Sequence, residues 1–192
     1  MTETMPLSSA VINLSDNFDD LLESLSTLQQ LGDLRADILD ERQIMHEALQ
    51  ILYQSYKATS CTIYSWSGKL ENRPDLTASD ALLAIDSNGT IFQRAATKIE
   101  LLFINNSISE NSMQHCNDCA TLGSEYQCTH LETSIISVPL RINDQLTGVI
   151  TISHSNRAHF NSWGYRLMQI FSTFLSQQLT ICRLEKNLKE LK

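Results

Sequence analysis

Residues 133–153, which read TSIISVPLRINDQLTGVITIS, are the stretch from which the fold can be inferred. The aliphatic residues from Ile136 to Ile142 occupy every second position, and this two-residue period predicts a β-strand with one buried face. Asn143-Asp144 favours a turn, because both side chains tolerate turn conformations. A second strand follows, and its buried face is predicted to consist of Leu146, Ile150 and Ile152. Together these segments predict a β-hairpin, with Pro139 at a bulge or where a neighbouring strand stops pairing.

The composition of the chain is that of an ordinary globular protein. Its 192 residues are 42% hydrophobic and 19% charged, which suits one well-buried core but is short for two domains. With 22 acidic and 14 basic residues the formal net charge is −8, and this argues against nucleic acid as a partner. No apolar run approaches the roughly 20 residues that span a bilayer, and no signal peptide begins the chain. We therefore expect a cytoplasmic protein whose thiols stay reduced.

Both ends of the chain carry helical patterns of apolar residues. Between Phe18 and Leu31 such residues recur every three or four positions, and near the other end Ser162 can cap a helix that begins at Trp163. The apolar spacing in this second helix alternates between three and four, which indicates a coiled-coil seam. The repeat consists of Leu167, Ile170, Phe174, Gln177, Ile181, Leu184, Leu188 and Leu191. Its first half is expected to pack on the domain's own sheet, and the part from Ile181 onward to form the seam. Because neither the Phe18–Leu31 pattern nor the seam after Ile181 has enough domain left to cover it, we expect a parallel homodimer formed by the terminal helices.

The middle of the chain predicts the rest of a sheet. A helix should begin near Asp40, where Gln43 completes a capping box, and residues 61–64 should form the first strand. Residues 81–85 fit a strand better than a helix. Residues 91–96 fit a short helix, and residues 101–104 fit a buried strand. The stretch from Asn105 to Tyr126 has no periodicity and is predicted to be a loop.

Four side chains suited to metal binding crowd together just before the hairpin. Cys116 and Cys119 have the Cys-x2-Cys spacing that lets two thiolates reach one metal ion. Cys128 and His130 are two positions apart, so in an extended strand both face the same side. Three thiolates and one imidazole suit a tetrahedral structural zinc ion. The sequence therefore predicts a zinc site at these four residues, with His115 as an alternative fourth ligand.

Other interpretations of this cluster stay open. Its cysteines could be ordinary free thiols, a thiol/disulfide switch built on Cys116 and Cys119, or ligands of an iron site. The remaining cysteines, Cys61 and Cys182, lie in apolar patterns and are predicted to be buried in the core. No Ser-His-Asp arrangement, glycine-rich phosphate loop or suitably spaced carboxylate pair occurs, so we expect no enzymatic activity from this chain.

Most of the chain, from Asp40 to Ile181, resembles a GAF domain. Asn88-Gly89, followed by Ala95-Ala96-Thr97 and by the run LLFINN at 101–106, is similar to that family's central unit. Residues 134–150, with their Val-Pro-Leu and Leu-Thr-Gly-Val-Ile motifs, resemble its closing hairpin, and residues 161–180 resemble its C-terminal helix. The cysteine cluster is similar in placement to an insert found in some bacterial sensors, including nitrate sensor kinases.

Two signatures of GAF subfamilies are missing from the sequence. Bilin-binding members attach their chromophore at a Cys-His pair, whereas here Thr129 separates Cys128 from His130. Cyclic-nucleotide-binding members carry a motif like Asn-Lys-Phe-Asp, which this sequence lacks. The resemblance therefore favours neither of these ligands.

The resemblance implies an α+β fold, in which an antiparallel sheet has helices on one face and a small-ligand pocket on the other. The pocket would lie between the hairpin and residues 81–106, and its candidate lining residues, each equally a candidate for plain core, are Tyr64, Phe92 and Phe103. The implied organisation is an N-terminal helical segment at 1–39, a sensory domain at 40–181 and the start of a signalling coiled coil at 182–192.

GAF domains are usually input modules, so the resemblance also implies a function. We expect a non-catalytic sensory domain that binds a small ligand or metal and signals through its C-terminal helix to a fused effector. That effector would be a GGDEF (diguanylate cyclase) or histidine kinase domain. The alternative is a thiol redox enzyme, because some free-standing GAF proteins reduce methionine sulfoxide with loop cysteines. Those proteins lack a continuing coiled coil, so the heptad pattern favours the sensor.

Overall fold

A computed structural model describes residues 21–22, 24–34, 39–66, 76–77, 80–86, 88–122, 133–142 and 145–190. Within these residues one antiparallel sheet has the strand order β3-β2-β1-β6-β5-β4. The strands are β1 Ser60–Ser65, β2 Ala81–Ile85, β3 Ile91–Ala95, β4 Gln114–Cys116, β5 Ser134–Ile142 and β6 Gln145–His154. The helices are α2 Glu41–Ser55, α3 Lys98–Glu110 and α4 Ser162–Glu190, with a single 3₁₀ turn, η2, at Cys119–Leu122. The predicted α+β class is confirmed.

The predicted hairpin forms as β5 and β6, but one residue of its predicted core changes face. The register shifts between Leu140, which pairs with Gly148, and Arg141, which pairs with Leu146, so Thr147 is the extra residue of a bulge. Beyond the bulge the side-chain alternation is reversed. Leu146 therefore packs in a different cluster from Ile150, although the sequence pattern placed them together.

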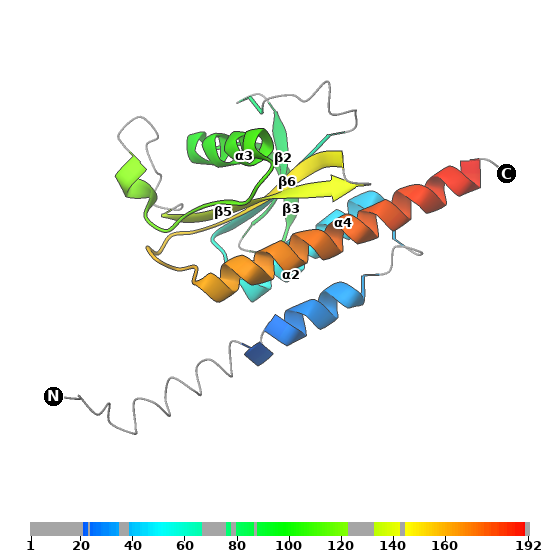
Figure 1. The fold of residues 1–192 in the computed structure, drawn as a ribbon, viewed down its shortest axis with the longest axis horizontal. Coiled ribbons are helices and arrows are strands. Elements are labelled where there is room, and N and C mark those ends of the chain that lie inside the picture. Colours follow the sequence, from blue (N-terminus) through cyan, green and yellow to red (C-terminus); the bar gives the residue numbers. More distant parts are fainter. Residues whose placement is uncertain are drawn as a thin grey trace.

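The sheet separates two layers of helices. Figure 1 shows α3 on one side of the sheet and α2 with α4 on the other. The α2/α4 side holds the larger core, to which β1, β5 and β6 contribute their aliphatic side chains, such as Ile63, Ile136 and Ile150. Under α3 lie two smaller apolar clusters, one around Tyr64 and Val149 and the other around the two cysteines Cys116 and Cys119.

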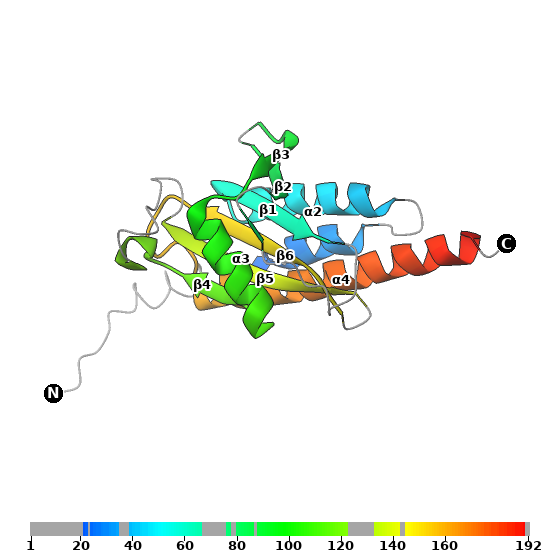
Figure 2. The ribbon, with the colours of Figure 1, turned by 90° about the horizontal axis from the view of Figure 1, so that it is seen from above.

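A helical segment at residues 24–32 lies against α2 and α4 on the side away from the sheet (Figures 1 and 2). Its Leu31 is fully buried in the larger core, and Leu28 packs against that core. The expectation that nothing in the domain covers the Phe18–Leu31 pattern is therefore wrong for these two leucines. Leu21, Leu22 and Leu25 remain exposed.

Two elements between residues 91 and 110 differ from the sequence prediction. Residues 91–95 form strand β3, not a helix, because they pair along their whole length with β2. Residues 101–104 are not a strand but the middle of α3, which buries Ile99, Phe103, Ile104 and Ile108 in the three- and four-residue period of a helix. The predicted loop from Asn105 to Tyr126 accordingly contains the end of α3, strand β4 and η2.

Both predicted helix starts are close to the observed ones. Asp40 and Gln43 form the expected capping box at α2. Helix α4 begins at Ser162, and its cap is the preceding residue, Asn161, whose Oδ1 accepts a hydrogen bond from the Gly164 N–H at 2.7 Å. In both views the C-terminal part of α4 projects past the sheet. In the part of the chain that the structure describes, no helix is long and apolar enough to cross a membrane.

Beyond Ser137, the edge of β5 that faces away from β6 has no neighbouring strand among the described residues, and we call this part of β5 its unpaired stretch. Strand β4 pairs only with Ile135, Ile136 and Ser137, so the pairing stops just before Pro139, as the sequence indicated. Two residues further on, the backbone N–H of Arg141 donates to the Ser176 hydroxyl of α4 at 3.0 Å.

Gly148 allows β6 to approach β1 closely, and this predicts a stability effect. A Cβ added at Gly148 would lie 2.7 Å from the backbone oxygen of Tyr64, so Gly148→Ala must push the two strands apart. We expect the free energy of unfolding to fall by about 1–3 kcal/mol, measured by urea denaturation.

Gly32 provides the control for this substitution. It is helical, and an added Cβ would have no atom within 4 Å, so Gly32→Ala should leave stability unchanged or raise it by up to about 1 kcal/mol. Equal effects of the two substitutions would contradict the role assigned to Gly148.

Candidate ligand-binding site

Five hydroxyl side chains form a band on the face of the sheet that lies under α3. The strand alternation that turns Cys61, Ile63, Ile150 and Ile152 toward α2 and α4 turns their neighbours the opposite way. This hydroxyl band consists of Ser60 and Thr62 in β1, Ser137 in β5, and Thr151 and Ser153 in β6. The register pairs Ser60 with Ser153, Thr62 with Thr151 and Ser137 with Thr151. Each of the five residues therefore has another member of the band directly opposite it on a neighbouring strand.

Four of the five side chains in the band are buried and Ser60 is half-buried. Two of the buried hydroxyls have no hydrogen-bond partner among the residues that the structure describes. Thr62 is 1% exposed and Ser153 is 1% exposed, and neither oxygen has a hydrogen-bond partner among the described residues. By contrast, the Ser137 and Thr151 hydroxyls bond to each other at 2.8 Å. A buried hydroxyl without a partner costs about 1–3 kcal/mol, and such groups in native proteins usually meet ordered water or a bound molecule. The two free hydroxyls therefore mark a place where a polar ligand would gain hydrogen bonds.

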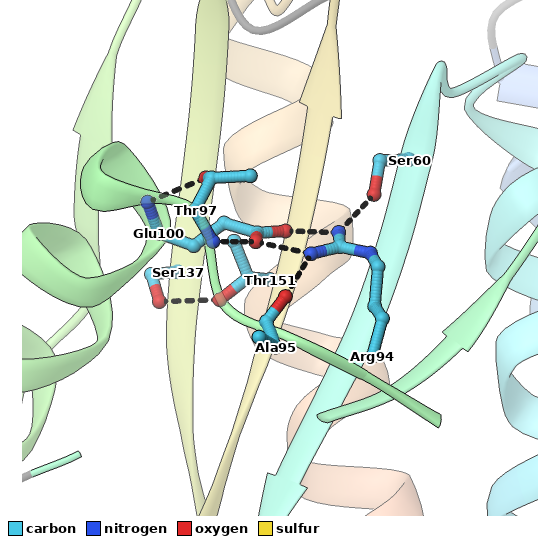
Figure 3. Close-up of polar contacts among 7 residues, drawn as sticks. All are labelled: Ser60, Arg94, Ala95, Thr97, Glu100, Ser137 and Thr151. Atoms are coloured by element: carbon cyan, nitrogen blue, oxygen red, sulfur yellow. Dashed lines mark hydrogen bonds and ion pairs between the residues drawn. The ribbon is translucent and has the colours of Figure 1, made fainter. Parts of the chain in front are cut away.

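An ion pair between the half-buried Arg94 and the buried Glu100 connects β3 to the start of α3, as Figure 3 shows. The Arg94 guanidinium in β3 donates to both carboxylate oxygens of Glu100, at 2.6 and 2.7 Å, and the Glu100 side chain is 1% exposed. Arg94 also donates to Ser60 at 2.9 Å. Glu100 in turn completes the capping box of α3 with Thr97. Because the two charges neutralise each other in a bidentate pair, the ion pair adds no net charge beside the band.

Burial keeps the Cys61 thiol and the Tyr64 hydroxyl protonated. Burial, and then the negative charge of Glu100, raises the pKa of the Cys61 thiol. Cys61 is fully buried, which confirms the prediction that it is a core residue, whereas Cys182 is only partly buried and packs at the margin of the core. Burial, and then Asp80, raises the pKa of the Tyr64 hydroxyl. Neither Cys61 nor Tyr64 has the lowered pKa of an activated nucleophile.

The aromatic residues proposed from the sequence occupy different positions. Tyr64 and Phe103 are each 6% exposed and belong to the two apolar clusters under α3. Phe92 is 39% exposed on β3, at one end of the strand order. Tyr64 and Phe103 thus flank the hydroxyl band, and Phe92 does not enclose it.

The two described cysteines of the predicted metal site lie close to the band. Cys119 is fully buried and Cys116 half-buried in one apolar cluster with Ile99, Phe103 and Ile135. The other predicted ligands, Cys128 and His130, lie outside the described residues. Among the residues that are described, no three His, Cys, Asp or Glu side chains are grouped as metal ligands.

His115, the alternative fourth ligand, points away from these thiols. It pairs with Ile136 in the ladder, whereas Cys116 pairs with Ile135, so the two side chains lie on opposite faces of the sheet. The His115 ring instead stacks on Tyr165 of α4, with ring centroids 4.2 Å apart. This arrangement keeps His115 out of a site shared with Cys116.

A separate groove of about 820 Å³ runs between α4 and the unpaired stretch of β5. Its lining includes Met113, Pro139, Gln177 and Ile181. Several hydroxyls along it are already used within α4, where Thr173 donates to the Gln169 carbonyl and Thr180 to the Ser176 carbonyl. The hydroxyl band lies on the other face of the sheet, so the groove is not part of that site.

A comparison with protein families matches residues 40–179 to the GAF domain model. The chain belongs to the GAF domain family. Its GAF domain covers the whole sheet, and the hydroxyl band lies on the face opposite the N- and C-terminal helices. Comparison with curated proteins gave no significant sequence match.

Solved structures with the same fold have varied roles. The GAF domain of a phosphoenolpyruvate-protein phosphotransferase from Coxiella burnetii is 12% identical, with TM-score 0.59, over 88% of this chain and 98% of that one. A proposed GAF sensor protein from Burkholderia vietnamiensis is 16% identical, with TM-score 0.61, over 85% and 98%. The free methionine-R-sulfoxide reductase of Neisseria meningitidis, solved with its substrate, is 13% identical, with TM-score 0.51, over 76% and 91%. At these identities the likeness establishes the fold, which sensors and enzymes share.

Sequence reasoning missed both the hydroxyl band and the ion pair. The capping-box spacing of Thr97 and Glu100 is a visible signal for the start of α3, and it would have placed Glu100 next to β3. Nothing local indicates that the serines and threonines of β1, β5 and β6 are buried, because alternating hydroxyls also suit an exposed face.

Proposed function

We propose that this GAF domain is a non-catalytic sensory module whose small polar ligand binds at the hydroxyl band beneath α3. The observation that carries the proposal is the pair of buried, unpartnered hydroxyls of Thr62 and Ser153. A molecule offering both donors and acceptors would satisfy these groups, and the neutralised Arg94–Glu100 pair leaves no net charge to be matched. Helix α4 would carry the signal to a fused GGDEF or histidine kinase domain.

A thermal-shift screen of nucleotides, amino acids, haem and nitrate tests the ligand site. A ligand at about 100 times its Kd stabilises a protein by about 2.7 kcal/mol, which for a chain of this size raises Tm by about 5–10 °C. Thr62→Val and Ser153→Ala should abolish that shift. In the ligand-free protein these two substitutions should be neutral or stabilising, because each removes a buried hydroxyl that has no partner.

Ser137→Ala is the matched control for stability. It leaves the buried Thr151 hydroxyl without its partner, so the ligand-free protein should lose about 1–3 kcal/mol. If Thr62→Val destabilises the protein as much as Ser137→Ala does, and no compound raises Tm, the proposed site is wrong.

We further propose that two copies associate through α4. One face of this helix is buried in its own domain, through Met168, Phe171, Leu175 and Leu179. A second face stays apolar and exposed, with Ile170, Ile181, Leu184 and Leu188 between 43% and 61% exposed. Together with the partly buried Phe174 and the exposed Gln177, these residues keep the alternating spacing of a coiled-coil seam over about 27 Å of helix. Leu167, the first residue of the predicted seam, is instead buried in its own domain. A second copy is the occupant that fits, because a heptad seam is complementary to itself.

The dimer is tested by Leu184→Glu combined with Leu188→Glu. Two charges in the seam should convert the protein to a monomer in light scattering at tens of micromolar, while the far-ultraviolet circular dichroism stays unchanged. Lys186→Glu is the control, because it makes the same change in formal charge at an exposed position outside the seam. A wild-type chain that is monomeric at this concentration would refute the proposal.

We also propose that Cys116, Cys119, Cys128 and His130 hold a structural zinc ion. Among the described residues, the support for this zinc site is that Cys116 and Cys119 lie on the same side of the sheet and pack in the same apolar cluster. Thiolates are the ligands that zinc prefers in closed structural sites. Bound zinc would tie this segment to the start of β5, where the Cys119 N–H already donates to the Thr133 carbonyl at 2.8 Å.

Elemental analysis of protein purified without added metal tests the zinc site. We expect about one zinc per chain, lost in Cys119→Ser and retained in Cys61→Ser, whose thiol lies in the larger core.

Protein without metal, and with titratable thiols at Cys116, Cys119 and Cys128, would instead favour the second candidate function. That candidate is a thiol redox enzyme, and it is favoured by the adjacent thiols of Cys116 and Cys119 and by the shared fold of methionine sulfoxide reductases. Turnover of free methionine sulfoxide with a dithiol reductant would identify it.

A further inference from the structure

The short segment from His115 to Cys119 lies between α3 and the start of α4. Cys116 and Cys119 pack with Ile99 and Phe103 of α3. His115 stacks on Tyr165, in the first turn of α4. A single run of five residues therefore contacts both helices, which otherwise lie on opposite sides of the sheet (Figure 1).

Asn117 makes the principal polar contacts of this segment with the loop that leads into α4. Its backbone oxygen accepts from the Ala158 N–H at 2.8 Å and from the Ser134 hydroxyl at 3.2 Å. Its side-chain Nδ2 donates to the Phe160 carbonyl at 2.7 Å. Asn117 thus holds the backbone of the loop at two residues, Ala158 and Phe160.

Neighbouring contacts reinforce this connection. Asp118 pairs with Arg157 at 3.4 Å, and the Thr133 N–H donates to the His154 carbonyl at 2.8 Å. The His154 ring stacks on His159 with centroids 3.5 Å apart. Burial, and then the charge of His159, lowers the pKa of His154, so the His154 ring favours its neutral form.

The loop in turn sets the position of the first turn of α4. Phe160 is 3% exposed and meets the Tyr56 ring edge-on. Asn161 caps the helix, and the Tyr56 hydroxyl donates to the Gly164 carbonyl at 2.7 Å. A displacement of the Phe160 carbonyl would therefore move the helix cap.

We infer that residues 115–119 transmit changes beneath α3 to the first turn of α4, with Asn117 as the positioning residue. The inference rests on the proposed function in taking the α3 face as the input and α4 as the output. The segment suits this role because β4 has three residues and, of the described strands, pairs only with β5. It therefore shifts at lower cost than a central strand. It contacts α3 through Cys116 and Cys119 and α4 through His115.

Amide hydrogen exchange on the full chain tests this coupling without any ligand. Phe103→Leu loosens the cysteine cluster, whereas Ile108→Val makes a comparable change on α3 in the other cluster, around Tyr64 and Val149. We expect Phe103→Leu to speed exchange at Tyr165 and the following amides by about fivefold or more relative to Ile108→Val. Amides near Leu175, where α4 packs in the larger core, should not respond.

A double substitution separates transmission from a merely structural role. If Asn117 carries the change, Asn117→Ala should itself speed exchange in the first turn, and adding Phe103→Leu should have little further effect there. His115→Ala, at an exposed position, provides a second variant that should weaken the response if Asn117→Ala fails to fold.

Two outcomes would overturn the inference: equal effects of Phe103→Leu and Ile108→Val at Tyr165, or an undiminished response in the Asn117→Ala and His115→Ala backgrounds. Because no ligand is used, neither outcome bears on the hydroxyl band. A failed ligand screen would likewise leave the coupling intact.

Discussion

The antiparallel pairing of β6 with β1 and β5 is the constraint on which both the core and the candidate site depend. Each of these strands contributes aliphatic side chains to the larger core and hydroxyls to the opposite face, as Ile63 and Thr62 illustrate in β1. A slip of one residue would put the hydroxyls into the larger core. The close approach of Gly148 to the backbone of Tyr64 and the bulge at Thr147 oppose such a slip. The same ladder therefore fixes the core and aligns the hydroxyl band.

Elements with a clear local period could be predicted from the sequence. The hairpin, the start of α2 and the long α4 depend on alternation, capping and heptad spacing, which are properties of short stretches. The prediction of a strand at residues 101–104 was wrong because four consecutive apolar residues fit a strand and a buried helix equally well. Strand β3 could not be predicted because its stability comes from pairing with β2, and its own sequence, IFQRA, has little alternation.

The candidate site was harder to predict than the fold because it is formed by contacts between distant segments. The hydroxyls of β1, β5 and β6 become a buried site only once α3 covers them. The proximity of Cys116 and Cys119 followed from their spacing. That His115 lies on the other face follows from strand alternation, but only once residues 114–116 are known to be a strand. No hydrophobic period indicates a strand there.

The unpaired stretch of β5 has a consequence for how copies of this protein can meet. An open strand usually offers amide hydrogens to which a strand of another molecule can add. Here Pro139 has no amide hydrogen, and the one on Arg141 is taken by Ser176 of the molecule's own α4. A foreign strand could extend the sheet on this side only by displacing that helix contact. This arrangement opposes open-ended growth of the sheet at this edge, and it is compatible with the proposed association through α4, in which a second copy would cover the exposed seam.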